Sequence, residues 1–249
     1  EQLIRSKTGL PLDAYFSASK LHWVCSNYQL FDRLDDYCFG TVDSWVLWNL
    51  TKNKVHKTDV SNASRTSLFD IHQLSYDTDL CDLFKVSPQL LPEVCASDAN
   101  FDLINGDFFG QEIPIQAVLG DQQASLFFHT YQQQGVLKNT YGTGLFMVAP
   151  TGDKVAAGQD VLSTVAWQVQ GQVTYAVEGS MFLGGAAIQW LRDELKWLDH
   201  TSHSEKLALS VSDNGGVYFV PAFVGMGAPF WDSSVRGSFM GLTRGVTKA

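Results

Sequence analysis

The sequence predicts a two-domain α/β protein, and three observations support that class of fold. The chain has 249 residues, which is enough for one large domain or two of ordinary size. Apolar residues make up 45% of it and aromatic residues 12%, so the chain can bury a substantial core. Strand-like and helix-like segments alternate in each half without a short-period repeat, which favours two α/β units over one barrel.

The first third of the chain carries two helical patterns and an extended segment. Apolar residues at helical spacing predict a helix at 17–27. Another helix is predicted after Thr41, which is a suitable N-cap residue, with Trp45 and Trp48 on an aromatic face. The following segment, 54–70, predicts a strand and then a turn rich in Ser and Asn.

The middle of the chain predicts a strand followed directly by a helix. "IPIQAVLG" reads as a buried strand that ends at Gly120. The helix after it is amphipathic, because apolar residues fall at i, i+3, i+4 and i+7, namely Ala124, Phe127, Phe128 and Tyr131.

The joint between the two domains is predicted at "QQQG", residues 132–135, which gives domains 1–133 and 134–249. The second domain is expected to contain a strand pair within 163–179 and a helix at 182–197.

Charge and composition exclude several classes of function. The net charge is -9, whereas a nucleic-acid surface needs clustered basic residues. The longest uncharged stretch, 214–231, contains two prolines and four glycines, so no membrane insertion is predicted. The four cysteines are widely spaced without a CxxC pair, which favours a reduced, cytoplasmic protein.

Asp121 is a candidate for chemistry because it follows the predicted strand and opens the predicted helix. A carboxylate there can act as a helix N-cap, which is the structural interpretation. It can also act as a general base at the carboxyl end of a strand, where open α/β sheets bind ligands. Gln122 and Gln123 add amides that could hold a polyol.

Two glycine-rich motifs in the second half leave further alternatives open. Gly142 and Gly144 flank Thr143 in "TYGTG", which is either an ordinary hairpin turn or a turn whose amides and hydroxyl meet a phosphate. Gly185 and Gln189 lie one turn apart on a predicted helix, facing either another helix or a bound ring. The histidines form no ligand pattern, so no metal site built from protein ligands alone is predicted.

Seven motifs in this order resemble the FGGY carbohydrate kinase family, and in particular its members that act on glycerol. They are "TGLPLDAYFSASKLHW", "FGTVDSWVLWNLT", "TDVSNASRTSLFDIH", "GDQQASLF", "KNTYGTGLFM", "EGSMFLGGAAIQWLRDE" and "GVYFVPAFVGMGAPFWD". The resemblance implies two actin-like, ribonuclease-H-type α/β domains flanking a cleft. Family members are about twice this length, so the chain is expected to be an internal fragment in which both domains are incomplete, and to be inactive alone.

The resemblance also implies an activity, which is phosphorylation of glycerol to sn-glycerol 3-phosphate with ATP and Mg²⁺. The resemblance assigns polyol binding to residues 1–133 and nucleotide binding to residues 134–249. Asp121 resembles the general base, and the residues that resemble glycerol ligands are Tyr15, Asp121, Gln122 and Phe146. Those that resemble nucleotide contacts are Thr143, Gly185 and Gln189.

Other functions and properties remain open at the level of sequence. One alternative is another FGGY kinase acting on xylulose, ribulose or gluconate, and another is a non-catalytic actin-like ATP-binding protein. A homo-oligomer, dimer or tetramer, is expected for the full-length protein. Some bacterial relatives bind a sugar bisphosphate inhibitor through a Gly/Arg loop, but Glu112 stands in that loop here, which predicts no such inhibition.

Overall fold

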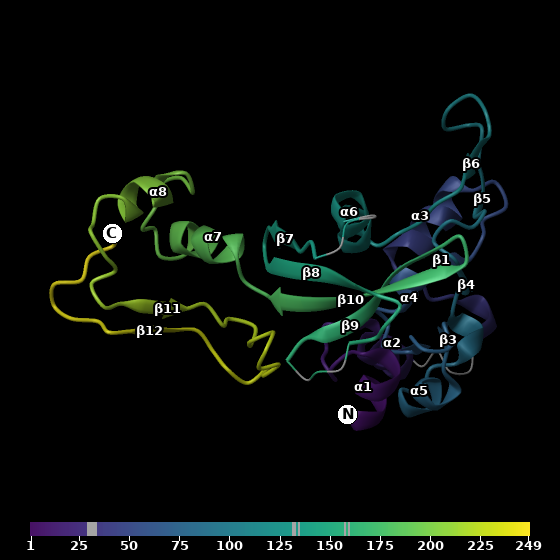
Figure 1. The fold of residues 1–249 in the computed structure, drawn as a ribbon, viewed down its shortest axis with the longest axis horizontal. Coiled ribbons are helices and arrows are strands. Elements are labelled where there is room, and N and C mark those ends of the chain that lie inside the picture. The colour runs from purple at the N-terminus through teal and green to yellow at the C-terminus, as the bar shows by residue number, and fades with distance from the viewer. Residues whose placement is uncertain (29–33, 131–132, 134, 157, 159) are drawn as a thin grey trace. The chain divides into compact units, whose positions relative to one another are not determined.

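The protein is described from a computed structural model in which the chain forms two compact units (Figure 1). The structure describes residues 1–28, 34–130, 133, 135–156, 158 and 160–249. Unit 1 comprises Glu1–Leu137, Val148–Gly158 and Leu162–Glu178. Unit 2 comprises Lys138–Met147, Gln159–Val161 and Gly179–Ala249.

Unit 1 combines short helices with short strands. Its helices are α1 (Gln2–Thr8), α2 (Ser17–Asn27), α3 (Val42–Leu50), α4 (Val60–Ala63), α5 (Thr78–Leu83) and α6 (Asp121–Thr130), with 3-10 turns at Leu34–Asp36 and Pro88–Leu90. Its strands are β1 (Lys57–Asp59), β2 (Phe69–Asp70), β3 (Ser75–Tyr76), β4 (Glu93–Cys95), β5 (Asp102–Ile104), β6 (Ile113–Ile115) and β9 (Leu162–Val169).

Unit 2 contains two helices, α7 (Gly185–Asp193) and α8 (His203–Ala208), among its described residues. Its strands are β7 (Lys138–Tyr141), β11 (Tyr218–Val220) and β12 (Ser238–Met240). Two longer strands, β8 (Leu145–Gly152) and β10 (Gln172–Met181), contribute residues to both units.

The largest described sheet has four strands in the order β7-β8-β10-β9. Within it β10 pairs antiparallel with β9, and a register shift between Thr174 and Tyr175 marks a bulge. Strands β1 and β4 form a parallel pair, while β2-β3, β5-β6 and β11-β12 are antiparallel pairs. The mixture of helices with parallel and antiparallel strands confirms the predicted α/β class.

Strand β9 is the centre of the unit 1 core. Val165 packs with Val60 and Ala63 of α4, whereas its neighbour Ala166 packs with Leu126 of α6. Because successive residues of a strand face opposite sides, α4 and α6 pack against opposite faces of the sheet. The helix that carries Asp121 is therefore fixed to the core of its unit.

The predicted elements agree with the structure where periodicity was strongest. The helix at 17–27 is confirmed as α2, and the strand pair is confirmed as β9 and β10. The helix expected at 182–197 is shorter, and the turn expected after β1 begins with the short helix α4. Tyr131 and part of the predicted joint at 132–135 lie outside the described residues, so the 133/134 boundary stays a prediction.

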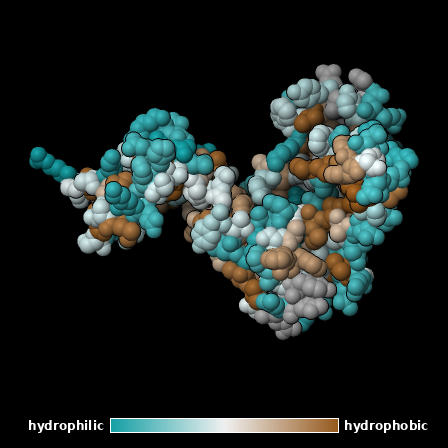
Figure 2. Space-filling model, turned by 90° about the horizontal axis from the view of Figure 1, so that it is seen from above, coloured by the Kyte–Doolittle hydropathy of each residue, from teal (hydrophilic) through white to brown (hydrophobic). Residues whose placement is uncertain are grey.

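Helix α3 differs from its predicted packing. Thr41 occupies the N-cap position, but its hydroxyl donates to Asp43 and caps no amide. Trp45 is 68% exposed, and the helix buries Ser44 and Leu47 instead. Exposed hydrophobic residues also occur elsewhere: in Figure 2 they lie among hydrophilic residues on the visible face of each unit. The aromatic face of α3 thus does not belong to the core of unit 1.

Candidate active site

Asp121 is the first residue of α6 and is exposed to solvent. The carbonyl of Gly120 accepts the Ala124 amide at 2.7 Å, so Gly120 occupies the N-cap position. The Asp121 carboxylate accepts the amide of Gln122 at 2.8 Å and lies 3.4 Å from the Gln122 side-chain nitrogen. The N-cap interpretation of Asp121 is therefore wrong, although a carboxylate in the first turn still favours the helix dipole.

The strand expected immediately before Asp121 is also different. β6 ends at Ile115, and its residues are intermediate or exposed where a buried strand was expected. Residues 116–120 form a connecting segment between this strand and α6. Asp121 therefore does not stand at the end of a buried strand, and the position of its carboxylate depends on the contacts that fix residues 116–120.

Tyr15 lies just before α2 and is held by its backbone. Its amide donates to the Asp13 carboxylate at 2.7 Å, and its carbonyl accepts Lys20 Nζ at 2.9 Å. Its ring meets the ring of Phe16 edge-on, with centroids 5.2 Å apart, and Phe16 is buried. Partial burial raises the pKa of Tyr15, and the nearby Asp121 charge acts in the same direction. The phenol therefore stays protonated near neutral pH and can donate a hydrogen bond toward the Asp121 region.

A largely buried ion pair lies near Tyr15. Arg65 Nη2 donates to Glu178 Oε1 at 3.1 Å, and the Glu178 side chain is only 2% exposed. The Arg65 guanidinium lies 5.4 Å from the centre of the Phe16 ring, which allows a cation–π contact. Its charge opposes the rise in the pKa of Tyr15. This pair could not be predicted from the sequence, because its members are 113 residues apart and neither stands in an acidic or basic run.

In unit 2 the "TYGTG" turn is joined to the start of α7 by backbone hydrogen bonds. Gly142 closes the turn by donating its amide to the Gly144 carbonyl at 2.9 Å. The amides of Gly184 and Gly185 donate to the carbonyls of Thr143 and Gly142 at 2.7 and 2.8 Å. Ala186 adds a longer bond to Thr143 at 3.3 Å. The structure thus brings Thr143 and Gly185 together, with Gln189 one helical turn further along α7.

Close approaches of the protein's own backbone explain two of the three glycines that raised the possibility of a ligand. A Cβ on Gly185 would lie 2.8 Å from the Gly142 carbonyl oxygen, and one on Gly144 would lie 2.7 Å from the Met181 carbonyl oxygen. A Cβ on Gly142 would meet nothing closer than 3.8 Å. The protein's own backbone therefore accounts for Gly144 and Gly185, and Gly142 is the glycine with room for an approaching group.

The remaining predicted residues of unit 2 lie near the same turn. The Phe146 ring passes over Gly144, whose Cβ would lie 3.1 Å from a ring carbon. Thr143, Gly185 and Gln189 are exposed, and Phe146 is partly buried. The Thr143 hydroxyl, the Gln189 side-chain amide and the open backbone at Gly142 can contact a polar ligand such as a nucleotide phosphate.

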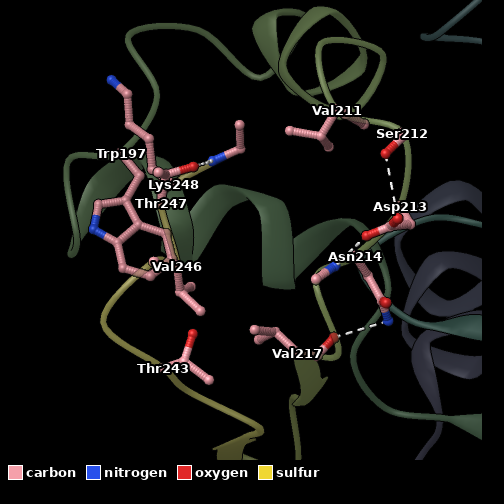
Figure 3. Close-up of a pocket in the computed structure, with 14 residues that line it drawn as sticks. Trp197, Val211, Ser212, Asp213, Asn214, Val217, Thr243, Val246, Thr247 and Lys248 are labelled. Atoms are coloured by element: carbon pink, nitrogen blue, oxygen red, sulfur yellow. Dashed lines mark hydrogen bonds between the residues drawn. The ribbon is translucent and has the colours of Figure 1, made fainter.

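Cavities occur within each unit. In unit 1 a cavity of about 790 Å³ lies beside Asp121 and is lined also by Gly120, Asn62 and Asp43. In unit 2 a cavity of about 840 Å³ lies between Trp197 and the 211–217 segment (Figure 3). Thr143, Gly185 and Gln189 are not among the residues that line it, so this hollow is separate from the predicted nucleotide contacts.

Neither a metal-ligand group nor a membrane-spanning helix occurs among the described residues. No group of three His, Cys, Asp or Glu side chains in the described ranges is arranged to hold a metal ion. Among the helices that the structure describes, none has the length and hydropathy of a membrane span.

Family models match both parts of the chain. Residues 1–128 match the N-terminal domain of the FGGY family of carbohydrate kinases, and residues 137–249 match its C-terminal domain. The chain therefore belongs to the FGGY family of carbohydrate kinases, and it has the actin-like, ribonuclease-H-type α/β fold expected from the resemblance.

Within that family the chain is similar to proteins named glycerol kinase. The chain is 50% identical over 252 residues to glycerol kinase of Dichelobacter nodosus, with 99% of this chain and 51% of the relative covered. It is 49% identical to glycerol kinase of Thermoanaerobacter sp., with 100% and 51% covered. The chain thus spans about half the length of the curated relatives it matches.

Solved structures agree with the family. The crystal structure of Plasmodium falciparum glycerol kinase with ADP matches with a TM-score of 0.82 at 34% identity, over 99% of this chain and 50% of that chain. Gluconate kinase from Lactobacillus acidophilus matches with a TM-score of 0.77 at 21% identity, over 99% and 50%. The second likeness is one of fold alone.

Proposed function

We propose that the protein containing this chain phosphorylates glycerol with ATP to give sn-glycerol 3-phosphate. The observation that carries the proposal is about 50% identity to glycerol kinases across 99% of the chain. The cluster of Tyr15, Asp121 and Gln122 supports it, since it combines a carboxylate, a phenol and an amide, which are groups that can bind and deprotonate a polyol.

Asp121 is the proposed general base. Its exposed carboxylate accepts the proton of a terminal hydroxyl as that oxygen forms a bond to the transferred phosphorus and the bond from phosphorus to the leaving ADP oxygen breaks. Phosphoryl transfer needs little covalent work from the protein, so holding the hydroxyl at the correct distance is the main task. The Gln122 bonds to the Asp121 carboxylate orient that group.

The other residues bind and orient. Tyr15 and Gln122 are proposed hydrogen-bonding partners of the remaining glycerol hydroxyls, and Phe146 is a proposed apolar wall for the glycerol carbons. The proposed nucleotide contacts are Thr143, Gly185 and Gln189. Their fit to a nucleotide is supported by the open Cβ position at Gly142 and by the exposure of all three residues. ATP supplies the phosphoryl group when bound.

Mg²⁺ is proposed to bind with the ATP phosphates, because this ion keeps several waters and binds through phosphates together with one or two carboxylates. The described residues contain no group of three His, Cys, Asp or Glu side chains that could hold a metal ion. We also propose a cytoplasmic location, which the four free cysteines support, and a homo-oligomer as the full-length state.

The test is ADP formation by the purified full-length protein with glycerol, xylulose, ribulose, gluconate or no acceptor. We expect turnover with glycerol far above that with any other acceptor. Equal or higher turnover with a sugar or gluconate would assign the protein to another branch of the family. ATP hydrolysis that does not depend on any acceptor, or none at all, would support a non-catalytic actin-like protein.

A further inference from the structure

A fully buried carboxylate, Asp59, stands at the start of α4 in unit 1. Five donors reach it within 3.1 Å: the amides of Ser61 and Asn62, the Asn62 side-chain amide, and the hydroxyls of Ser61 and Ser97. Burial raises the pKa of Asp59, and these donors act against that rise. Two of the bonds cap α4, so helix capping explains part of the cluster but not the two hydroxyls.

The two hydroxyls connect the carboxylate to different parts of the unit. Ser97 Oγ donates to Asp59 at 2.7 Å and accepts the Gln168 amide of β9 at 3.1 Å. Ser61 Oγ donates to Asp59 at 2.8 Å and accepts the Gly120 amide at 2.9 Å. An ionised carboxylate can only accept, so it fixes the direction of each hydroxyl proton and leaves a lone pair for the backbone amide.

Gly120 is consequently held at both of its polar backbone atoms. Its amide is bonded to Ser61, and its carbonyl accepts Ala124 in the first turn of α6. A Cβ on Gly120 would lie 2.6 Å from Oε1 of Gln123, a side chain that is only 4% exposed. The residue that follows is Asp121, so the backbone from which its carboxylate projects is set by these bonds.

We propose that Asp59 and Ser61 are positioning residues that orient Asp121 through the backbone of Gly120. The inference rests on the proposed function, and it adds that the direction of the base depends on a buried carboxylate that never touches the substrate. A misplacement on the order of 1 Å at such a site can cost about 100-fold in rate.

The experiment compares two serines that serve the same carboxylate in the full-length protein. Ser61→Ala leaves the Gly120 amide without its acceptor, and we expect kcat to fall roughly 10- to 100-fold with little change in the KM for ATP. Ser61→Thr keeps the hydroxyl and is expected to restore most of the kcat. Ser97→Ala is the matched control: it removes an equally buried hydroxyl from Asp59, so it should lower Tm by a similar amount while kcat stays near wild type.

The outcomes separate positioning from stability. Equal losses of kcat in Ser61→Ala and Ser97→Ala, or a wild-type kcat in Ser61→Ala, would overturn the proposal. Where Ser61→Ala does not fold, Ser61→Cys provides a weak donor and acceptor of similar shape, and an intermediate kcat supports the proposal while a wild-type kcat overturns it.

A parallel variant, Asp121→Asn, keeps this test distinct from that of the proposed function. Normal glycerol turnover in Asp121→Asn would show that Asp121 is not the general base, and would overturn its proposed role. An inactive Asp121→Asn beside a fully active Ser61→Ala would overturn only the positioning role.

Discussion

The two units hold their candidate site residues by different means. In unit 1, the Gly120 amide before Asp121 is bonded to Ser61, which donates to the buried Asp59 carboxylate, and Tyr15 lies near the Arg65–Glu178 pair. In unit 2, Thr143 and Gly185 are held by backbone hydrogen bonds across a contact too close for a Cβ. Unit 1 should therefore be sensitive to changes of charge and hydroxyl groups, whereas unit 2 should be sensitive to added volume.

The largest effect is expected from Asp121→Asn in the full-length protein. Asparagine keeps the shape of the side chain but cannot take the substrate proton, so kcat should fall by about 10²- to 10⁴-fold. That factor corresponds to roughly 3 to 5 kcal/mol in the barrier. Because Gly120 and not Asp121 is the N-cap, Tm should change little. Steady-state kinetics and thermal melting test this, and near-normal turnover with a lowered Tm would make the carboxylate structural.

A large loss of stability is expected from Arg65→Met, which leaves the Glu178 carboxylate in a buried position without its cation. Removing one member of a buried ion pair typically costs about 3 to 5 kcal/mol in the free energy of unfolding. Urea unfolding measures it. Lys52→Met is the control, because the Lys52–Glu112 pair is 60% and 42% exposed and should contribute at most about 1 kcal/mol. Similar losses in both variants would contradict the buried role of Arg65.

Added volume in unit 2 is tested by Gly185→Ala. The new Cβ would press on the Gly142 carbonyl, and overpacking of this kind costs roughly 1 to 3 kcal/mol. We expect a lower Tm and a higher KM for ATP, since α7 must move away from the turn. The matched variant is Gly142→Ala, which has room for its Cβ and should keep its Tm. If Gly142→Ala also leaves the KM for ATP unchanged, phosphates do not approach this glycine.

A smaller, pH-dependent effect is expected where α1 meets α5. Lys7 Nζ lies 2.6 Å from Asp77. Burial opposes ionisation of Asp77, but the bonds from Lys7 and the Leu80 amide outweigh it and hold the pKa of Asp77 below its ordinary value. This contribution to stability is present above the unfolded pKa of about 3.9 and is lost as pH falls through the lower folded value.

Melting curves of wild type and Lys7→Met between neutral and acidic pH test that expectation. The gap in Tm between the two proteins should be present at neutral pH and shrink below about pH 4. A gap that stays constant across this range would show that Lys7 contributes by packing and not by charge.

No effect at all is expected from fructose 1,6-bisphosphate on the full-length protein. Glu112 stands in the loop before β6, where it is paired with Lys52 at 2.7 Å, so this cation is already engaged by a carboxylate. Activity measured with increasing effector should remain constant. Strong inhibition that disappears on changing 106–112 would show that this loop binds the sugar bisphosphate despite Glu112.

The sequence predicted what depends on local pattern and missed what depends on distant contacts. The helix at 17–27 follows from the spacing of Ala18, Leu21 and Cys25, which the structure buries together. Asp59 in "TDVSNAS" looks like any turn residue, because its partner Ser97 lies 38 residues away. The likeness of Thr143 and Gly185 to nucleotide contacts came from motifs, while their direct adjacency required the fold.

The hydrogen bonds between the 142–144 turn and the first turn of α7 also bear on motion. Amides in such bonds exchange with solvent only when the bond opens, and here opening one segment requires the other to separate as well. Turn and helix therefore behave as a single cooperative element on the timescale of local unfolding. A molecule that ordered the turn alone would slow exchange at Gly184 and Gly185 too, so a binding event could be transmitted along the backbone without any change of side-chain rotamer.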